Sequence, residues 1–268
     1  MAGVVKPREL SDYLLSQGRP VVTLSEVSSL LGVDSKHATS ALVRLKRDNH
    51  MFSPARGLYI AVPPEYRTWG SIPALDFIDP MMTHIGHSYY VGFLSAAELH
   101  GAAHQHPQTF QVVTDGRVTD RDYGRVRVRF SRDSRAATLP VETRNTSTGT
   151  VRVATPAVVA LDLAACPNNG GGLNNTATVL GELAADGMVI INDVLAVSSL
   201  YPVSALRRLG WLLDLVYGGI DTDPLRVEME CRGNDESSPT LLSPGGPRRG
   251  RQCRRWSITV NEEVEPDL

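Results

Sequence analysis

The sequence predicts an α+β protein in which a small N-terminal domain precedes a larger mixed α/β domain. Residues 21–62 contain two helical patterns and then two apolar runs around a glycine turn. Residues 110–154 contain runs with the two-residue alternation of β-strands, and helical periodicity returns from residue 156. We therefore predict a DNA-binding domain at 1–67, a linker at 68–80 and a mixed α/β domain at 81–268.

A short helix is predicted to begin after Thr23. Thr23 and Glu26 have the spacing of a capping box, in which the hydroxyl accepts from the backbone N–H of residue 26 and the carboxylate reaches back. Gly32 lies where a helix commonly ends in a left-handed residue. After this break, Asp34 or Ser35 caps a second helix. Two helices joined by a three-residue turn are typical of a helix-turn-helix.

The second helix, which is predicted to run to about residue 49, has two different faces. Ala38, Leu42 and Leu45 recur at helical spacing and are expected to pack inward. The opposite face carries cations and hydroxyls, which suit a helix in the DNA major groove. Its candidate DNA-binding residues are Ser35, Lys36, His37, Thr39, Ser40, Arg44, Lys46 and Arg47.

Two apolar runs, 51–54 and 58–62, flank the turn Ala55-Arg56-Gly57 and predict a hairpin with Arg56 at its tip. Helix, turn, helix and hairpin in this order predict a winged helix-turn-helix, with Arg56 as a further DNA contact. The alternative interpretation is a solvated basic helix in an ordinary helical domain, because outer helix faces are commonly charged.

Charge is distributed unevenly along the chain. Residues 1–67 contain nine Lys/Arg and six Asp/Glu, a net charge of +3, which leaves −5 for the remaining residues and −2 overall. A basic N-terminal segment followed by an acidic remainder fits contact with DNA through residues 1–67. No apolar run approaches the ~20 residues of a membrane span, and the N-terminus does not have the pattern of a signal peptide. Three widely spaced cysteines indicate reduced thiols and a cytoplasmic protein.

In the larger domain, Ser95 and Glu98 have capping-box spacing and predict a short helix ending near Gly101. A cap at Thr155 followed by Pro156 predicts the start of another helix. Strands are predicted at 110–114, 125–130, 141–144, 151–154, 225–231 and 256–260. Helices are predicted at 157–165, from the loop after residue 175 through residue 185, and at 202–216.

Three groups of residues in this domain could carry chemistry. The histidines within His84–His106 include His100 and His104, whose i, i+4 spacing could hold a metal. We favour polar packing or hydrogen-bonded surface histidines, because the H-E-x-x-H motif is absent. Gly170–Gly172 lacks the lysine of a phosphate-binding loop and fits a helix connection better. Asp162 and Asp214 lie among apolar residues, and we expect structural ion pairs with Arg207 or Arg208.

We find no credible catalytic constellation, and we expect no metal and no cofactor. A dense but interrupted set of arginines includes Arg125, Arg127 and Arg129, which alternate along a predicted strand and so share one face. Because aspartates interleave with them, a solvated face is the default, a protein-partner surface the second interpretation and nucleic acid the third.

Several motifs of the larger domain resemble those of the AbiEi antitoxins, the regulator halves of AbiE-type (type IV) toxin–antitoxin systems. The motifs are Tyr89-Tyr-Val-Gly-Phe-Leu-Ser-Ala-Ala-Glu-Leu-His-Gly-Ala-Ala-His104, Ala154-Thr-Pro, Leu161-Asp-Leu, Gly171-Gly-Leu-Asn-Asn-Thr-Ala-Thr-Val-Leu180 and Arg208-Leu-Gly-Trp-Leu-Leu213. The resemblance implies an N-terminal DNA-binding domain that represses its own operon at promoter inverted repeats. It also implies a C-terminal domain that counteracts a co-encoded nucleotidyltransferase-like toxin.

Our interpretation from the sequence is a non-enzymatic, DNA-binding autorepressor and antitoxin. One alternative is a ligand-responsive transcriptional regulator, which would lack a neighbouring nucleotidyltransferase gene. The other is a metal-dependent enzyme built around His84–His106, which metal analysis of the purified protein would identify.

Overall fold

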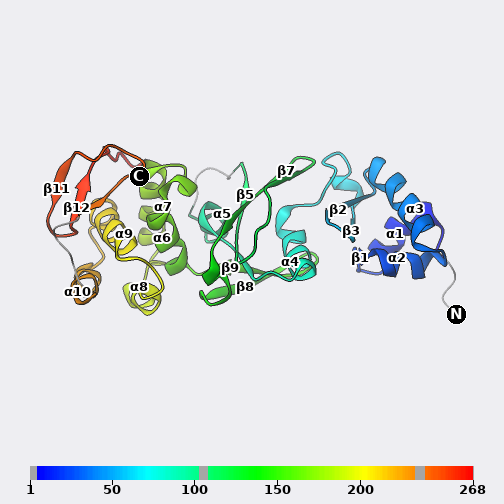
Figure 1. Ribbon diagram of the computed structural model, residues 1–268, viewed down its shortest axis with the longest axis horizontal. Coiled ribbons are helices and arrows are strands. Elements are labelled where there is room, and N and C mark those ends of the chain that lie inside the picture. The colour runs from blue at the N-terminus through cyan, green and yellow to red at the C-terminus, as the bar shows by residue number, and fades with distance from the viewer. Residues whose placement is uncertain (1–4, 103–107, 233–238, 268) are drawn as a thin grey trace. The chain divides into compact units, whose positions relative to one another are not determined.

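The computed structural model describes residues 5–102, 108–232 and 239–267 and is a mixed α/β protein, as predicted (Figure 1). It divides into two compact units. The first comprises residues 1–90, 108–137 and 143–152, and the second comprises 91–107, 138–142 and 153–268. The predicted domain boundary at residue 67 therefore falls inside the first unit. Within the described residues, no helix is both long enough and apolar enough to cross a membrane.

The N-terminal part of the first unit has the predicted order of elements. A 3₁₀ turn and helix α1 precede a short strand, two helices and a hairpin, and the three strands form one sheet in the order β1-β3-β2. These elements are η1 (Pro7–Glu9), α1 (Leu10–Ser16), β1 (Val21–Thr23), α2 (Leu24–Leu31), α3 (Ser35–Arg47), β2 (Met51–Ala55) and β3 (Leu58–Ala61). Apolar side chains from α1, α2, α3 and β2 form one buried core.

The segment predicted as a linker is partly helical, which corrects that part of the sequence interpretation. After η2 (Pro64–Tyr66), helix α4 spans Ala74–Ile85 and contains Pro80. Proline lacks the N–H that would bond to the carbonyl four residues earlier. Here that carbonyl, of Asp76, accepts a hydrogen bond from the Thr148 hydroxyl, while the Asp76 carboxylate accepts from the Ser147 N–H. A distant turn therefore satisfies the group that Pro80 leaves open.

A six-stranded sheet with the order β6-β7-β5-β4-β9-β8 follows. Its strands are β4 (Tyr89–Val91), β5 (Phe110–Thr114), β6 (Arg121–Tyr123), β7 (Val126–Arg132), β8 (Val141–Thr146) and β9 (Gly149–Ala154). Strands β5 and β7 pair in parallel, and β6 pairs antiparallel with β7. The predicted strands at 110–114, 125–130, 141–144 and 151–154 correspond to β5, β7, β8 and β9, with ends shifted by a few residues. A 3₁₀ turn, η3 (Ser134–Ala137), lies between β7 and β8.

The second unit is mainly helical and ends in a small sheet with the order β10-β12-β11. Its elements are α5 (Phe93–Leu99), α6 (Pro156–Ala165), η4 (Pro167–Gly170), α7 (Leu173–Ala185), α8 (Ile191–Ser198), α9 (Val203–Val216), α10 (Asp223–Cys231), β10 (Thr240–Leu241), β11 (Arg251–Cys253) and β12 (Ile258–Val260). Helix α6 is buried along nearly all of its length, which explains its uniformly apolar sequence. All three cysteines are free thiols, as predicted.

Two predictions about single elements in this unit are wrong. Ser95 lies inside α5, which begins at Phe93 after Gly92, so Ser95 and Glu98 do not form the predicted N-terminal capping box. Residues 225–231 lie in helix α10 instead of a strand, because Pro224 is in the first turn of the helix and Leu225 and Met229 are buried at helical spacing.

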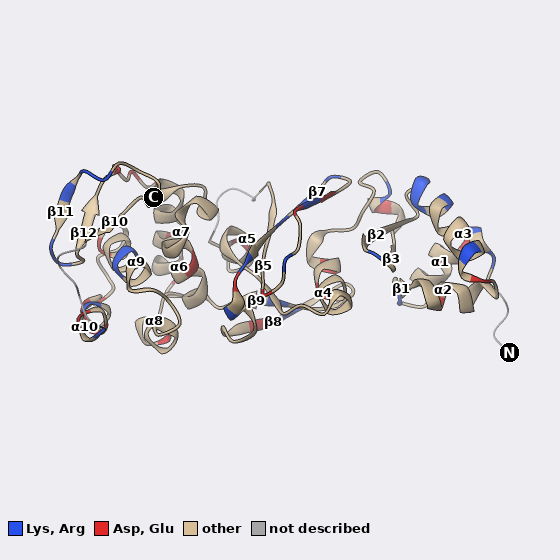
Figure 2. Ribbon diagram, in the orientation of Figure 1, with Lys and Arg blue, Asp and Glu red and all other residues tan. Residues whose placement is uncertain are grey.

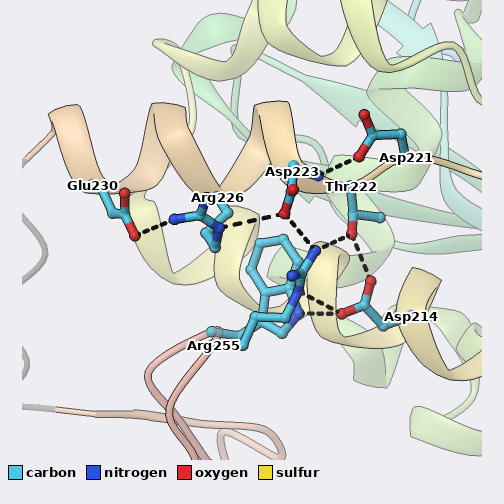
Figure 3. Close-up of polar contacts among 8 residues, drawn as sticks. Asp214, Asp221, Thr222, Asp223, Arg226, Glu230 and Arg255 are labelled. Atoms are coloured by element: carbon cyan, nitrogen blue, oxygen red, sulfur yellow. Dashed lines mark hydrogen bonds and ion pairs between the residues drawn. The ribbon is translucent and has the colours of Figure 1, made fainter.

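Asp214 is at the centre of a polar network in the second unit (Figure 3). Its carboxylate accepts hydrogen bonds from Trp256 Nε1 at 2.7 Å and Thr222 Oγ1 at 2.6 Å, and lies 3.0 Å from Arg255 Nε. The predicted ion pair of Asp214 with Arg207 or Arg208 is replaced by this pair with Arg255. Asp162 is buried and accepts from the Tyr201 hydroxyl at 2.7 Å. The network joins α9, the start of α10 and the C-terminal sheet, so its role is structural.

Candidate nucleic-acid interface

Three local features set the geometry of the helix-turn-helix. The Thr23 N–H donates to Glu26 Oε2 at 2.7 Å and the Glu26 N–H donates to Thr23 Oγ1 at 3.4 Å, which completes the predicted capping box of α2. Gly32 ends α2 with φ +62°, a left-handed conformation that glycine adopts without strain. Asp34 then caps α3, its Oδ1 accepting from the His37 N–H at 2.8 Å. The turn between the helices is therefore fixed at both ends.

Helix α3 has the two predicted faces. Ala38, Leu42 and Leu45 are buried together with Ala41, so this side of the helix packs on the core of the first unit. Figure 2 shows basic residues gathered on α3. All eight candidate DNA-binding residues of the helix are exposed: Ser35, Lys36, His37, Thr39, Ser40, Arg44, Lys46 and Arg47. The helix therefore presents polar and cationic side chains to solvent, with the exposed Val43 among them, and such an exposed helix face can enter the major groove.

The cations of this surface differ in how they are held. Among the described residues, no carboxylate forms an ion pair with Lys36, Arg44 or Lys46. Arg47 is paired with the adjacent Asp48, whose Oδ1 lies 3.0 Å from Arg47 Nε. Solvent-exposed pairs of this kind contribute little stability, so DNA phosphate can displace Asp48 from Arg47.

Asp34 also contacts the His37 ring, with Asp34 Oδ1 2.8 Å from His37 Nδ1. The hydrogen bonds from the His37 backbone and ring hold the pKa of the Asp34 carboxyl below its ordinary value. A depressed aspartate pKa adds stability that is present above the unfolded-state value of about 4 and is lost as the pH falls through the folded-state value.

We expect a carbon NMR titration of Asp34 to have its midpoint below about 4. The matched variant Asp34→Asn keeps a capping oxygen without a titrating charge. The fraction of α3 that remains helical should therefore fall on acidification below about pH 4 in the wild type and change less in this variant. An ordinary Asp34 midpoint would contradict the capping role of the charge.

A groove of about 630 Å³ runs along one side of the α3 surface. Its floor is apolar, formed by residues such as Leu31, Ala41 and Leu45, and its rim carries four cations. The rim cations are Lys6, Arg8, Arg44 and Arg47. Lys6 and Arg8 were not among the predicted site residues. The only feature of the sequence that could have indicated them is that two cations stand close together just before the first helix. A rim of four cations beside an exposed helix face suits the phosphate backbone of DNA.

The predicted hairpin is present, with Arg56 and Gly57 at its turn and the Arg56 side chain exposed. The turn is anchored on both sides. The Gly57 carbonyl accepts from the Leu24 N–H at 3.1 Å, and the Arg56 carbonyl lies 3.0 Å from His84 Nε2. Because a carbonyl only accepts, His84 carries its proton on Nε2. The hairpin is therefore a short, fixed wing, with Arg56 as its exposed cation.

The predicted partner surface on β7 is less uniform than the sequence pattern indicated. Arg125 precedes the strand, and its N–H donates to the Trp69 carbonyl. Arg129 Nη1 lies 2.8 Å from Asp122 Oδ1, which neutralises this side chain. Arg125 and Arg127 are exposed and have no ion pair within the described part of the chain. Two of the three arginines therefore remain accessible to a partner.

The histidines do not form a metal site among the described residues. His84 contacts the Arg56 carbonyl, and buried His100 donates from Nε2 to the Ala154 carbonyl at 2.8 Å. No group of three or more His, Cys, Asp or Glu that could hold a metal occurs in the described residues. His104 and His106 lie outside these residues. His84 is therefore an exposed histidine and His100 a buried one, and each is hydrogen-bonded to a backbone carbonyl.

Comparisons with known proteins agree with the sequence resemblance. The crystal structure of the RV2827C protein from Mycobacterium tuberculosis is similar, with a TM-score of 0.69 and 18% sequence identity over 96% of this chain and 93% of that one. At this identity the likeness shows a common fold. No curated protein matches the sequence. Residues 90–215 match the family of the AbiEi antitoxin C-terminal domain. Residues 90–215, which include most of the motifs quoted above, therefore form an AbiEi-type antitoxin C-terminal domain.

Proposed function

We propose that the protein is a cytoplasmic autorepressor that binds double-stranded DNA at inverted repeats of its own promoter through α3. The observation that carries this proposal is the fully exposed polar face of α3, with three cations that no described carboxylate neutralises. Phosphate contacts supply most of the affinity of such an interface, and base-edge contacts supply its specificity. The arrangement of helix, turn, helix and short wing supports the same conclusion.

The antitoxin family assignment supports a second role, protection against a co-encoded nucleotidyltransferase-like toxin. Repression of the operon lowers synthesis of the toxin, whereas direct neutralisation needs a protein surface. The exposed residues Arg125 and Arg127 are the candidates for such a surface, because charge complementarity favours an acidic partner.

Footprinting of the upstream region with the full-length chain, together with a reporter driven by that region, tests the first role. We expect protection of paired inverted repeats and repression of the reporter. Growth under toxin expression, with the antitoxin gene placed behind an unrelated promoter, tests the second. Rescue in that arrangement requires an action other than repression of the native promoter. Absence of protection over the upstream region contradicts the proposed autorepression.

Arg56 is proposed to contact a phosphate at the wing. Replacing Arg56 by alanine should weaken binding to operator and random DNA by similar factors. It should also lower the slope of log K against log salt concentration by about one unit, because one phosphate contact is lost. Fluorescence anisotropy at four salt concentrations measures both quantities. An operator-specific loss with an unchanged slope would instead indicate base recognition by Arg56.

The alternative of a ligand-responsive regulator differs from this proposal in one observable. A neighbouring gene for a nucleotidyltransferase favours the antitoxin, and its absence favours the ligand-responsive regulator. The metal-dependent enzyme is disfavoured, because His84 and His100 are each committed to a backbone carbonyl.

A further inference from the structure

Val43 is an apolar side chain in the middle of the polar face of α3. Its exposed fraction is 60%, the highest among the large hydrophobic residues of the described chain. Its neighbours one turn away on the helix surface include Thr39, Ser40 and Arg47, all exposed. A β-branched residue is also a poorer helix former than alanine, so helix stability gives no reason for valine here.

The two hydroxyls beside Val43 are already used within the helix. Thr39 Oγ1 donates to the Ser35 carbonyl at 2.7 Å, and Ser40 Oγ donates to the Lys36 carbonyl at 3.0 Å. Both hydroxyl protons are therefore directed at the backbone and away from a ligand. In this conformation the two hydroxyls offer a base only lone pairs and, for Thr39, a methyl group.

Val43 is consequently an apolar point on this face, with Arg44 next to it in sequence and further cations on both sides along the helix. Lys36 is two turns before Val43, and Arg47 is one turn after it. In the DNA major groove, the apolar feature of a base edge is the C5-methyl group of thymine, and aliphatic side chains recognise it by contact. Cations at the two ends of the helix can hold the flanking phosphates or guanines.

We propose that Val43, with the adjacent Thr39 methyl group, recognises the C5-methyl group of a thymine in bound DNA. The inference rests on the proposed DNA binding by α3 and adds the base that its central residue selects. It predicts that each operator half-site contains a thymine at the position facing Val43, with the base pairs contacted by the cations on either side.

Uracil substitution isolates the methyl group, since deoxyuridine lacks it and keeps the same base pairing. The probes are 40-base-pair duplexes tiled across the region upstream of this chain's own gene. Those that the full-length protein binds are remade with single thymines replaced by uracil. Loss of one buried methyl group should weaken wild-type binding about four-fold, from ~0.8 kcal/mol per methyl or methylene group, at one position in each half-site.

Val43→Ala should bind the thymine and uracil duplexes with equal affinity at that position. Val227→Ala, at a 48% exposed valine of α10, is the matched control and should keep the four-fold sensitivity of the wild type. Circular dichroism and thermal unfolding establish that both variants fold as the wild type does.

The inference is overturned if wild-type protein tolerates uracil at every thymine of a duplex that it binds, a result that leaves the proposed DNA binding intact. It is also overturned if Val43→Ala stays as sensitive to uracil as the wild type, because another side chain then contacts the methyl group. If no tiled duplex is bound, the proposed function fails and this inference fails with it.

Discussion

Replacing both Lys36 and Arg44 by alanine is expected to weaken operator binding by about 30-fold or more at fixed salt. Both side chains are exposed, and neither has an ion pair among the described residues, so their loss breaks no described ion pair in the free protein. If each contacts a base edge, the loss is about 1–3 kcal/mol per contact, and the lower limit of two contacts corresponds to this factor. If each contacts a phosphate, the salt slope also falls, by about two units.

The matched control removes the same charge from another surface. Arg125→Ala combined with Arg127→Ala also lowers the net charge by two, and both side chains are exposed and without a described ion pair. Operator affinity should change little in this control, while both double variants keep the wild-type unfolding midpoint, because exposed substitutions usually alter stability by under 0.5 kcal/mol. Equal weakening in the two double variants would show a non-specific charge effect and would contradict recognition by α3.

Local patterns were sufficient to predict the two helices and the turn that carry the candidate site. The capping box at Thr23 and Glu26, the left-handed Gly32 and the cap at Asp34 each act within four residues, so sequence alone determines them. Helical spacing separated the buried face of α3 from its exposed face correctly. The use of the Thr39 and Ser40 hydroxyls inside the helix was not predicted, although it also follows from contacts four residues apart.

Interactions between distant segments explain what the sequence interpretation missed. Residues 68–80 were predicted as a linker, but Thr148, 72 residues from Asp76 in sequence, bonds to the carbonyl that Pro80 leaves open inside α4. In α10, alternation of Leu225, Val227 and Met229 suggested a strand. The pair between Arg226 and Glu230, with 2.6 Å between nitrogen and oxygen, and the burial of only two of the three apolar residues fit a helix instead.

A cluster of three aromatic rings joins the wing sheet to the rest of the first unit. The ring of fully buried Phe77 on α4 lies 5.2 Å from that of Phe52 on β2 and 5.1 Å from that of Tyr123 on β6, both edge-on. The Tyr123 hydroxyl donates to the Pro54 carbonyl at 2.8 Å. Edge-to-face rings each add about 0.5–1.5 kcal/mol beyond their burial. We therefore propose that residues 1–67 and α4 unfold together.

Phe77→Ala should lower the free energy of unfolding of the first unit by about 3–5 kcal/mol, through lost burial and a residual cavity. Hydrogen exchange measured by mass spectrometry should show faster exchange in β2, β3 and α4, with α9 of the second unit as the internal reference. Phe77→Leu, which keeps most of the buried volume, should have a much smaller effect. If exchange accelerates in α4 while β2 and β3 keep wild-type protection, the domain boundary predicted at residue 67 is correct and the joint unfolding proposed here is wrong. Native domains are stable by only about 5–15 kcal/mol, so a loss of this size unfolds an appreciable fraction of the protein. If residues 1–67 and α4 unfold together, Phe77→Ala should therefore also weaken DNA binding, although Phe77 is fully buried and is not part of α3.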